Sequence, residues 1–162
     1  MKVALDGNSL TIEQVHDVAR NMAEVSLVPS AKKAVKECRR VAEKLMSEGQ
    51  LIYGVTTGIG ELSRVAVSPE QGEELQRRII RSHSAGVGKY FSEDSVRAAM
   101  LLRANVLARG YSAVRLELLD TLWIDLPRKI QCFVFLLRRQ PHVRALSLPL
   151  PRIHSHFSDI GL

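Results

Sequence analysis

The amino-acid sequence predicts a mainly α-helical protein with short extended segments near residues 3–5 and 25–28. Hydrophobic residues make up 46% of its 162 residues, which is enough for one domain with a core. Only 5% of the residues are aromatic, and the apolar content is mostly Leu, Val, Ala and Ile, which favours helices over a β-sandwich. In several stretches the apolar residues also recur at helical spacing behind a helix-start signal.

The N-terminal region predicts a short strand followed by a helix. Residues 3–5 come directly before the turn sequence Asp6-Gly7-Asn8. Thr11 is a predicted N-cap, and Gln14, three positions later, completes a capping-box pattern. We therefore expect a helix that continues to about Met22.

A second extended run and a longer helix follow. Residues 25–28 form the run, Pro29 stops it, and Ser30 is the predicted N-cap of the helix. The apolar residues of this helix share one face, and Gly49 is its natural C-cap. The residues of that face are Ala31, Ala34, Val35, Cys38, Val41, Ala42 and Leu45.

Residues 50–68 lack helical periodicity and predict a loop, since glycines and threonines gather in them. The sequence Ser68-Pro69-Glu70 predicts the next helix start, because proline is favoured at the first helical position. This helix is expected to reach about Ser84 and to end near residues 85–88.

A further helix is predicted from Ser92 or Asp94 to Gly110. Its residues are apolar nearly all round, which is typical of a helix buried between others in a large bundle or an oligomer. Residues 113–124 are expected to start one more helix.

The composition changes after Leu126. Four of the six prolines follow this residue, and residues 127–162 hold six basic side chains but one acidic side chain. We therefore divide the chain into a domain of residues 1–123 and a divergent basic tail of residues 124–162.

The net charge of +6 does not indicate a nucleic-acid partner, because the positive charge is confined to the tail. Residues 1–126 hold 17 basic and 16 acidic side chains and are nearly neutral. The sequence has no run of Lys and Arg interleaved with aromatic residues, which a nucleic-acid surface would require. We expect no nucleic-acid partner.

The cysteine, histidine and hydropathy patterns argue against a disulfide-rich protein, a metal-binding protein and a membrane protein. Cys38 and Cys132 form neither a disulfide framework nor a metal-binding spacing, so both are expected to be buried apolar side chains. His154 and His156 lack a third ligand, so no metal site is expected. With no signal peptide and no stretch approaching the roughly 18 apolar residues of a membrane span, we expect a cytoplasmic protein without membrane contact.

Tyr53 lies in the glycine-rich loop and has two interpretations. A tyrosine can act as a general base only if its pKa falls well below its usual value of about 10. Gly54, Gly58 and Gly60 would let the backbone turn sharply and approach a ligand closely. Alternatively, Tyr53 packs at the edge of a turn. The glycine spacing does not fit a dinucleotide-binding fingerprint, so no such cofactor is expected.

His83 also has two interpretations. It lies near the end of a predicted helix, behind Arg77, Arg78 and Arg81, where it could bind a substrate carboxylate or imidazole or shuttle a proton. Alternatively, the helix dipole favours a histidine at a C-terminus without any functional role. The pattern alone leaves both interpretations open.

Three blocks of the sequence together carry a family resemblance. They are Tyr53-Gly-Val-Thr-Thr-Gly-Ile-Gly60, then Leu75-Gln76 with Ser82-His-Ser-Ala-Gly-Val-Gly88, then Arg103-Ala-Asn105 with Leu107-Ala-Arg-Gly-Tyr-Ser-Ala-Val-Arg115. In order and spacing they resemble the N-terminal portion of the histidine/aromatic amino-acid ammonia-lyases, whose members carry a methylidene-imidazolone group. The resemblance extends from about residue 3 to residue 122.

The resemblance implies a fold, an assembly and residue roles. The fold would be the N-terminal portion of an ammonia-lyase-type helical bundle, and family members assemble as homotetramers. Tyr53 would be the base that removes the β-proton of the amino-acid substrate, Gly60 would lie in the substrate pocket, and His83 would contact the substrate side chain. The Ser82-His83 pair is similar to the histidine-specific branch and to some bacterial tyrosine aminomutases, and it argues against phenylalanine.

The resemblance also implies an electrophile that this chain lacks. Family members form the methylidene-imidazolone group from an Ala-Ser-Gly tripeptide, which occurs nowhere in the 162 residues. We hypothesise that the tail is read in the wrong frame, or comes from a degraded gene, and ends early. Sequencing the DNA past codon 123 tests this, and the hypothesis fails if no other frame encodes a Gly-Ala-Ser-Gly-Asp block.

The resemblance therefore implies a fragment of an enzyme like histidine ammonia-lyase, which converts L-histidine to urocanate and ammonia. We expect the fragment to be inactive alone. One alternative is a tyrosine ammonia-lyase or tyrosine 2,3-aminomutase. Another is a non-catalytic helical module that binds a partner.

Overall fold

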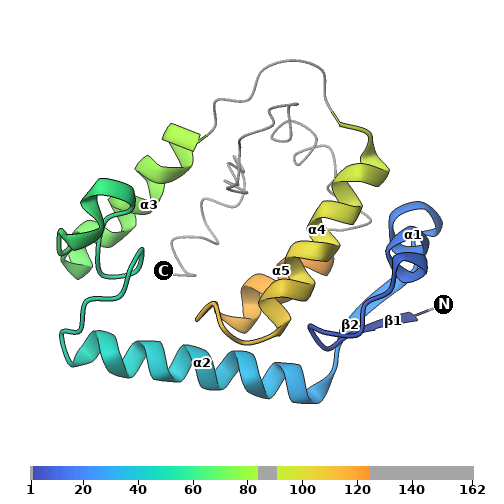
Figure 1. The fold of residues 1–162 in the computed structure, drawn as a ribbon, viewed down its shortest axis with the longest axis horizontal. Helices are drawn as coiled ribbons and strands as arrows, with labels where there is room; N and C mark the ends of the chain where they lie inside the picture. Colours follow the sequence, from blue (N-terminus) through green and yellow to red (C-terminus); the bar gives the residue numbers. More distant parts are fainter. Residues whose placement is uncertain (1, 84–90, 125–162) are drawn as a thin grey trace. The chain divides into compact units, whose positions relative to one another are not determined.

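The computed structural model describes residues 2–83 and 91–124, and this part of the chain is mainly α-helical, as predicted. Its α-helices and strands are labelled in Figure 1, and all of its elements are given next in chain order. They are β1 (Lys2–Leu5), α1 (Ile12–Asn21), β2 (Glu24–Leu27), α2 (Pro29–Ser47), the 3-10 helix η1 (Gly60–Arg64), α3 (Pro69–His83), α4 (Glu93–Ala108) and α5 (Leu116–Ile124). The predicted tail, Cys132, His154 and His156 lie outside the described residues.

The described chain falls into two compact units. Residues 2–39 and 91–124 belong to the first unit, and residues 40–83 belong to the second. The division lies within α2, between Arg39 and Arg40. The two units hold different kinds of structure: the first contains β1, β2, α4 and α5, and the second contains the glycine-rich loop and α3.

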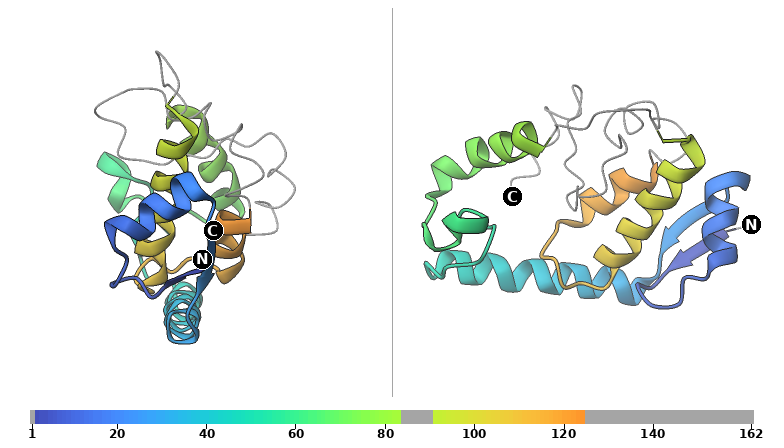
Figure 2. Two further views of the ribbon diagram at one scale, coloured as in Figure 1. Left: turned by 90° about the vertical axis from the view of Figure 1, so that its right-hand side faces the viewer. Right: turned by 45° about the horizontal axis from the view of Figure 1, so that its top comes forward.

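The two extended segments of the first unit pair as a small parallel sheet, visible as adjacent arrows in Figure 2. In its register Val3 lies opposite Val25 and Leu5 opposite Leu27. The side chains of Val3 and Leu5 are buried, whereas those of the residues before them are exposed, as alternation along a strand requires. Parallel strands need a crossover connection, and α1 supplies it.

The predicted capping box of α1 is confirmed. The Gln14 backbone N–H donates to Thr11 Oγ1 at 3.3 Å, and the Thr11 backbone N–H donates to Gln14 Oε1 at 3.0 Å. The helix ends at Asn21, and Met22 follows with a φ of 56°, the left-handed conformation common at helix ends.

The turn between β1 and α1 is held by the Asp6 carboxylate. Asp6 Oδ1 accepts hydrogen bonds from the backbone N–H groups of Asn8 at 2.7 Å and Ser9 at 2.8 Å. These two donors, the Ser9 amide first, lower the pKa of Asp6 to about 2. The turn therefore contributes its full stability only while Asp6 is ionised.

Acidification should accordingly weaken the folded state as Asp6 gains its proton. Because the folded pKa lies below the unfolded value, the contribution is present above about pH 4 and is lost as the pH falls towards 2. A carboxyl-carbon NMR titration should show an Asp6 midpoint near 2. In Asp6→Asn the stability should depend less on pH over this interval. An Asp6 midpoint near 4 would contradict the hydrogen-bonded turn.

The start of α2 corrects the predicted N-cap. The helix begins at Pro29, so Ser30 lies inside its first turn instead of capping it. Proline fits here because it lacks the N–H that the first helical residue leaves unpaired. The predicted C-cap is confirmed, since Gly49 has a φ of 72°. Its N–H donates to the Met46 carbonyl and the N–H of Gln50 donates to the Leu45 carbonyl, which is a Schellman motif.

The core of the first unit lies around α4, which packs against α1 and α5. The predicted start of α4 is confirmed in position, since Ser92 is its N-cap, but the Ser92 hydroxyl pairs with Ser95 Oγ and caps no backbone amide. The helix ends at Ala108, two residues before the predicted end. Buried hydrophobic side chains fill this core, namely Val3, Leu5, Val18, Ala19, Leu27, Ala31, Val35, Val96, Met100, Leu101, Ala104, Leu107, Ala108, Val114, Leu119 and Leu122.

One side of α4 does not follow the prediction of all-round burial. Leu102 and Val106 are 49% and 51% exposed, whereas Leu101 is completely buried. The two exposed residues are four positions apart and so share one helical face. The helix is therefore covered on one side and open on the other within the described part of the chain.

Arg97 is a buried charged residue at the junction of α1 and α4. Its Nε donates to the Ala19 carbonyl at 2.6 Å, and its Nη1 lies 3.5 Å from Glu93 Oε2. The carbonyls of the last helical turn have no partner within the helix, so Arg97 supplies one for α1. The bond fixes the C-terminal end of α1 against α4.

Helix α5 begins at Leu116 rather than at residue 113. Ala113 has a φ of 52°, which is unusual for a residue with a Cβ and incompatible with a right-handed helix. Its N–H donates to Cys38 Sγ at 3.3 Å, and its carbonyl accepts from Arg39 Nη1 at 3.3 Å. Contacts with α2 thus hold Ala113 out of the helix, and Cys38 is half-buried with a polar contact instead of being a fully buried apolar residue.

The second unit has little core of its own in the described residues. Of its hydrophobic side chains that the structure describes, Ala42 is buried, and several larger ones are 36% to 66% exposed. These exposed side chains are Val41, Leu45, Leu51, Tyr53, Leu62 and Val65. Local hydrogen bonds, described below, hold the loop in this unit.

Two properties of the described residues bear on function. No helix within residues 2–83 and 91–124 combines the length and apolar character that a membrane crossing needs. In the same residues no three His, Cys, Asp or Glu side chains gather as a metal site would require.

Candidate functional site

The glycine-rich loop follows α2 and folds back on itself. The N–H groups of Val55 and Thr56 both donate to the Ile52 carbonyl at 3.0 Å, which closes a tight turn around Tyr53 and Gly54. Gly54 has a φ of 70°, a conformation that glycine adopts without steric cost. The predicted loop thus has a defined turn at the position of Tyr53.

The second half of the loop is a narrow hairpin closed by backbone hydrogen bonds. Thr57 and Ala66 form an antiparallel bridge, flanked by bonds from Gly58 N–H to the Val65 carbonyl and from Val67 N–H to the Thr56 carbonyl. The 3-10 helix η1 lies inside this hairpin, where the sequence predicted loop. A Cβ on Gly58 would stand 2.6 Å from the Leu62 Cβ, so the close approach of the two sides needs glycine here.

Two predicted site residues, Tyr53 and Gly60, meet in this loop. The Gly60 backbone N–H donates to Tyr53 Oη at 3.4 Å. The Tyr53 side chain is 66% exposed, so its ring is not held by packing, contrary to the alternative of a tyrosine packed at a turn. Gly60 has a φ of 61°, and nothing lies within 4 Å of the place where a Cβ would stand. The loop therefore presents a phenol and a backbone donor side by side on an open surface.

The third predicted site residue, His83, is the last residue of α3. Its side chain lies outside the described part of the structure, and so does the continuation of its block, residues 84–90. The predicted helix start at Pro69 is confirmed, and the helix reaches His83, close to the predicted end. The structure thus describes α3 as far as His83 and brings Tyr53 together with Gly60.

The last turns of α3 are rich in arginine. Arg77, Arg78 and Arg81 precede His83, and Arg78 Nε donates to Glu74 Oε1 at 2.9 Å. The Arg78 hydrogen bond is the main cause that lowers the pKa of Glu74. The partial negative charge at the C-terminal end of a helix favours cationic side chains such as these.

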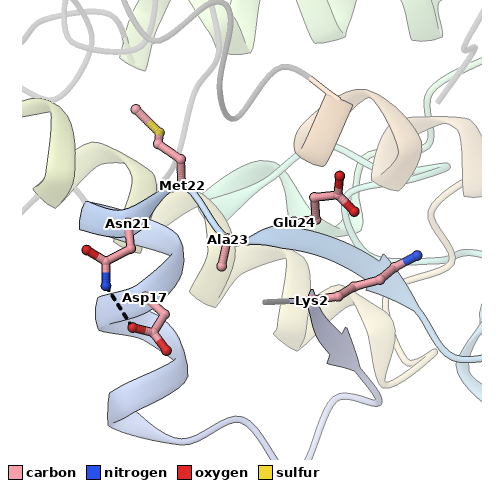
Figure 3. A pocket seen from close by; sticks show the side chains of 6 residues that line it. All are labelled: Lys2, Asp17, Asn21, Met22, Ala23 and Glu24. Atoms are coloured by element: carbon pink, nitrogen blue, oxygen red, sulfur yellow. Dashed lines mark hydrogen bonds between the residues drawn. The ribbon is translucent and has the colours of Figure 1, made fainter.

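A surface depression of about 660 Å³ lies elsewhere, in the first unit, and contains none of the predicted site residues (Figure 3). It is lined by Lys2, Asp17, Asn21, Met22, Ala23 and Glu24. The Asn21 amide donates to Asp17 Oδ1 at 2.9 Å, so part of its polar lining is already paired. It is open to solvent, so we do not assign it a role.

The sequence pattern predicted no role for Thr56 and Thr57, although both lie inside the first of the three family blocks. The structure shows that both hydroxyls bind backbone groups of the loop. Two adjacent threonines among glycines could have predicted these bonds, because threonine hydroxyls commonly form hydrogen bonds with nearby backbone groups in turns.

One family model and several curated proteins each match most of this chain. The model of the aromatic amino acid lyase family matches residues 10–135. The chain is 50% identical over 121 residues to a histidine ammonia-lyase of Caldanaerobacter subterraneus subsp. tengcongensis, which covers 75% of this chain and 24% of that protein. The chain therefore spans about a quarter of the length of the curated relatives it matches.

Two solved structures agree with this relationship. The crystal structure of histidine ammonia-lyase from Trypanosoma cruzi matches with a TM-score of 0.71 and 35% identity, covering 78% of this chain and 25% of that one. The tyrosine aminomutase from Streptomyces globisporus matches with a TM-score of 0.73 and 39% identity, covering 79% of this chain and 24% of that one.

Proposed function

Because the chain belongs to the aromatic amino acid lyase family, we propose that it is the N-terminal, base-carrying portion of a histidine ammonia-lyase. Such an enzyme eliminates ammonia from L-histidine to give urocanate. The single observation that carries the proposal is the Tyr53–Gly60 contact, which places an exposed phenol beside a backbone donor within the family's first block. The 50% identity to a protein named histidine ammonia-lyase supports histidine as substrate.

In this proposal each site residue keeps the role that the resemblance implies. Tyr53 removes the β-proton of the substrate, and its exposure leaves the phenol accessible to a bound amino acid. Gly60 lies beside it in the substrate pocket, where the lack of a side chain leaves room for the ligand. His83, at the arginine-rich end of α3, contacts the substrate side chain.

The residues present do not fit the family's methylidene-imidazolone group. That group forms from Ala-Ser-Gly, and the 162 residues contain no such tripeptide. No step through the group is therefore assigned to this chain, and we propose that the chain alone has no lyase activity. Lyase activity would need an electrophile from outside these 162 residues.

The exposed apolar side chains of the second unit support packing against a further part of such an enzyme. Leu51, Leu62 and Val65 lie in or beside the Tyr53 loop and are 53% to 62% exposed. Exposed apolar side chains gain free energy when they are buried against a partner. We propose that they pack against the remaining part of an ammonia-lyase, within the homotetramer that the family resemblance implies. A cytoplasmic location is part of the same proposal.

Reconstitution tests this function. The full chain would be mixed with the Caldanaerobacter histidine ammonia-lyase from which the matching 121 residues have been deleted, and urocanate absorbance would be followed. We expect activity with histidine from the mixture and none from either component alone. If the mixture forms a stable complex but shows no activity, the proposal is wrong.

A tyrosine-specific enzyme is the second candidate, because the chain is 39% identical to a tyrosine aminomutase. The Ser82-His83 pair is compatible with both substrates. Offering tyrosine in place of histidine to the reconstituted mixture separates them, and turnover of tyrosine alone would favour the aminomutase or tyrosine ammonia-lyase.

A non-catalytic interaction module is the third candidate, and the exposed apolar side chains favour it equally. Measuring the mass of the purified chain in solution tests this third candidate. A well-folded monomer or dimer that binds lyase subunits without restoring activity would favour the module. Aggregation of the chain would favour a portion that needs the rest of the enzyme.

The division into residues 1–123 and 124–162 also remains a proposal, and the change in charge and proline content supports it. The family match ends at residue 135, twelve positions beyond the proposed boundary. Limited proteolysis should remove the tail and leave a core of about residues 1–123. Protection of the whole chain would speak against the boundary.

A further inference from the structure

The backbone on either side of Tyr53 is bound by two adjacent threonine hydroxyls. The N–H of Ile52, directly before Tyr53, donates to Thr56 Oγ1 at 2.8 Å. The N–H of Gly54, directly after it, donates to Thr57 Oγ1 at 3.2 Å. The peptide group that follows Tyr53 and the one that precedes Ile52 are therefore each anchored to a threonine side chain.

Each hydroxyl also donates its own proton to a carbonyl. Thr56 Oγ1 donates to the Gln50 carbonyl at 2.9 Å, and Thr57 Oγ1 donates to the Gly58 carbonyl at 2.9 Å. With one bond accepted and one donated, each hydroxyl bridges two points of the loop. Valine has nearly the same shape as threonine but could make neither bond.

The burial of Thr57 indicates that these two hydrogen bonds stabilise its hydroxyl at this position. Thr57 is 2% exposed, and Arg97 is the other buried polar or charged side chain in the described part of the chain. A hydroxyl at a buried position is favourable only when it is hydrogen-bonded, as this one is. Tyr53, by contrast, is 66% exposed, so its position depends on its backbone.

Thr57 also connects Tyr53 to the part of the loop that holds Gly60. It forms the antiparallel bridge with Ala66, and Gly58 N–H donates to the Val65 carbonyl at 3.1 Å. The hairpin closed by these contacts contains η1, which begins at Gly60. Thr57 is thus bonded both to the peptide that follows Tyr53 and to the hairpin that presents the Gly60 amide.

We propose that Thr56 and Thr57 are positioning residues that hold the Tyr53 phenol against the Gly60 amide. Neither touches the reacting atoms, and both act through the backbone N–H groups of Ile52 and Gly54, the residues on either side of Tyr53. The catalytic consequence rests on the proposed function of Tyr53, whereas the threonine clamp itself is defined by the hydrogen bonds of the loop.

The clamp is tested on the full chain by NMR. Thr57→Val should raise the hydrogen-exchange rate of the Gly54 amide about tenfold, since one buried hydrogen bond is lost, and should weaken the nuclear Overhauser effect between the Gly60 amide and the Tyr53 ring. Thr57→Ser keeps the hydroxyl and should restore both signals. Unchanged Gly54 exchange and an unchanged Tyr53–Gly60 contact in Thr57→Val would overturn the proposal.

Thr11→Val is the matched control. It removes a threonine hydroxyl that also accepts from a backbone amide, that of Gln14 at 3.3 Å, but in the other unit. It should accelerate exchange at Gln14 and leave Gly54 unaffected. An equal effect of Thr11→Val on Gly54 would mean that Thr57→Val acts through general destabilisation, which would also overturn the clamp.

Activity in the reconstituted mixture tests the catalytic consequence. Thr57→Val should lower kcat with little change in KM for histidine, and Thr57→Ser should recover kcat. An altered Gly54 exchange with an unchanged kcat would overturn the positioning role. If the parent chain restores no activity, the proposed function fails, and the exchange data still decide whether the clamp exists.

Discussion

Replacing Tyr53 by phenylalanine is expected to reduce the kcat of the reconstituted lyase by roughly 10²- to 10⁴-fold, the range of a lost general base. The substitution removes the phenol oxygen and leaves the ring. The fold should not change, because Tyr53 is 66% exposed and the Gly60 bond that it loses is long, at 3.4 Å. Urocanate formation measures the rate, and far-ultraviolet circular dichroism checks the fold.

Tyr111→Phe provides the control for this effect. Tyr111 is also exposed, at 81%, and lies in the first unit with the Arg109 guanidinium 5.6 Å from its ring centroid. The same atom is removed there, and kcat should stay at the parent value. Equal kcat values for Tyr53→Phe and the parent would show that Tyr53 is not the catalytic base, despite the sequence resemblance.

Replacing Leu101 by alanine should lower the free energy of unfolding by about 3 kcal/mol, within the range for a buried leucine. Leu101 is completely buried on α4, the helix that packs against both α1 and α5. Removing its side chain leaves a cavity that the surrounding helices can fill only in part. Urea denaturation followed by circular dichroism measures the change, and the slope of the transition should stay constant.

The neighbouring substitution Leu102→Ala isolates the contribution of burial. Leu102 is 49% exposed on the same helix, so its truncation should cost less than about 1 kcal/mol. If both substitutions cost the same, then Leu102 is covered in solution, and the open face of α4 is in fact an occupied interface.

Most element types and positions followed from local sequence signals. The Thr11–Gln14 capping box and the Gly49 C-cap depend on side chains within a few residues of the helix end, so a short stretch of sequence is sufficient to predict them. The wrong start of α2 came from an equally local ambiguity. Both Pro29 and Ser30 are helix-start residues, and the structure uses the proline.

The start of α5 could not be predicted in this way. Residues 113–115 suit a helix, but Ala113 is held in a left-handed conformation by Cys38 and Arg39. Those partners are 74 and 75 residues away along the chain. A similar distant contact explains Gly110, because a Cβ at this position would stand 2.7 Å from the backbone carbonyl carbon of Ala34.

The loop that carries the proposed site was predictable from the sequence, but the hydrogen bonds that hold it were not. The motif around Tyr53 identified Tyr53 and Gly60 as partners of one loop, and their contact is present. The support of that loop by Thr56 and Thr57 was missed, because which backbone groups a threonine hydroxyl reaches depends on the turn that the whole loop adopts.

Taken by itself, the sequence determined the helical class, most helix ends and the family. All three depend on residue types and on spacings of a few positions, which act through local backbone preferences and short motifs. Only the tertiary structure decided the parallel pairing of β1 with β2, the exposed face of α4 and the burial of Arg97. These depend on contacts between distant residues, such as the bond from Arg97 to Ala19, 78 positions apart, which exists only once the chain has folded.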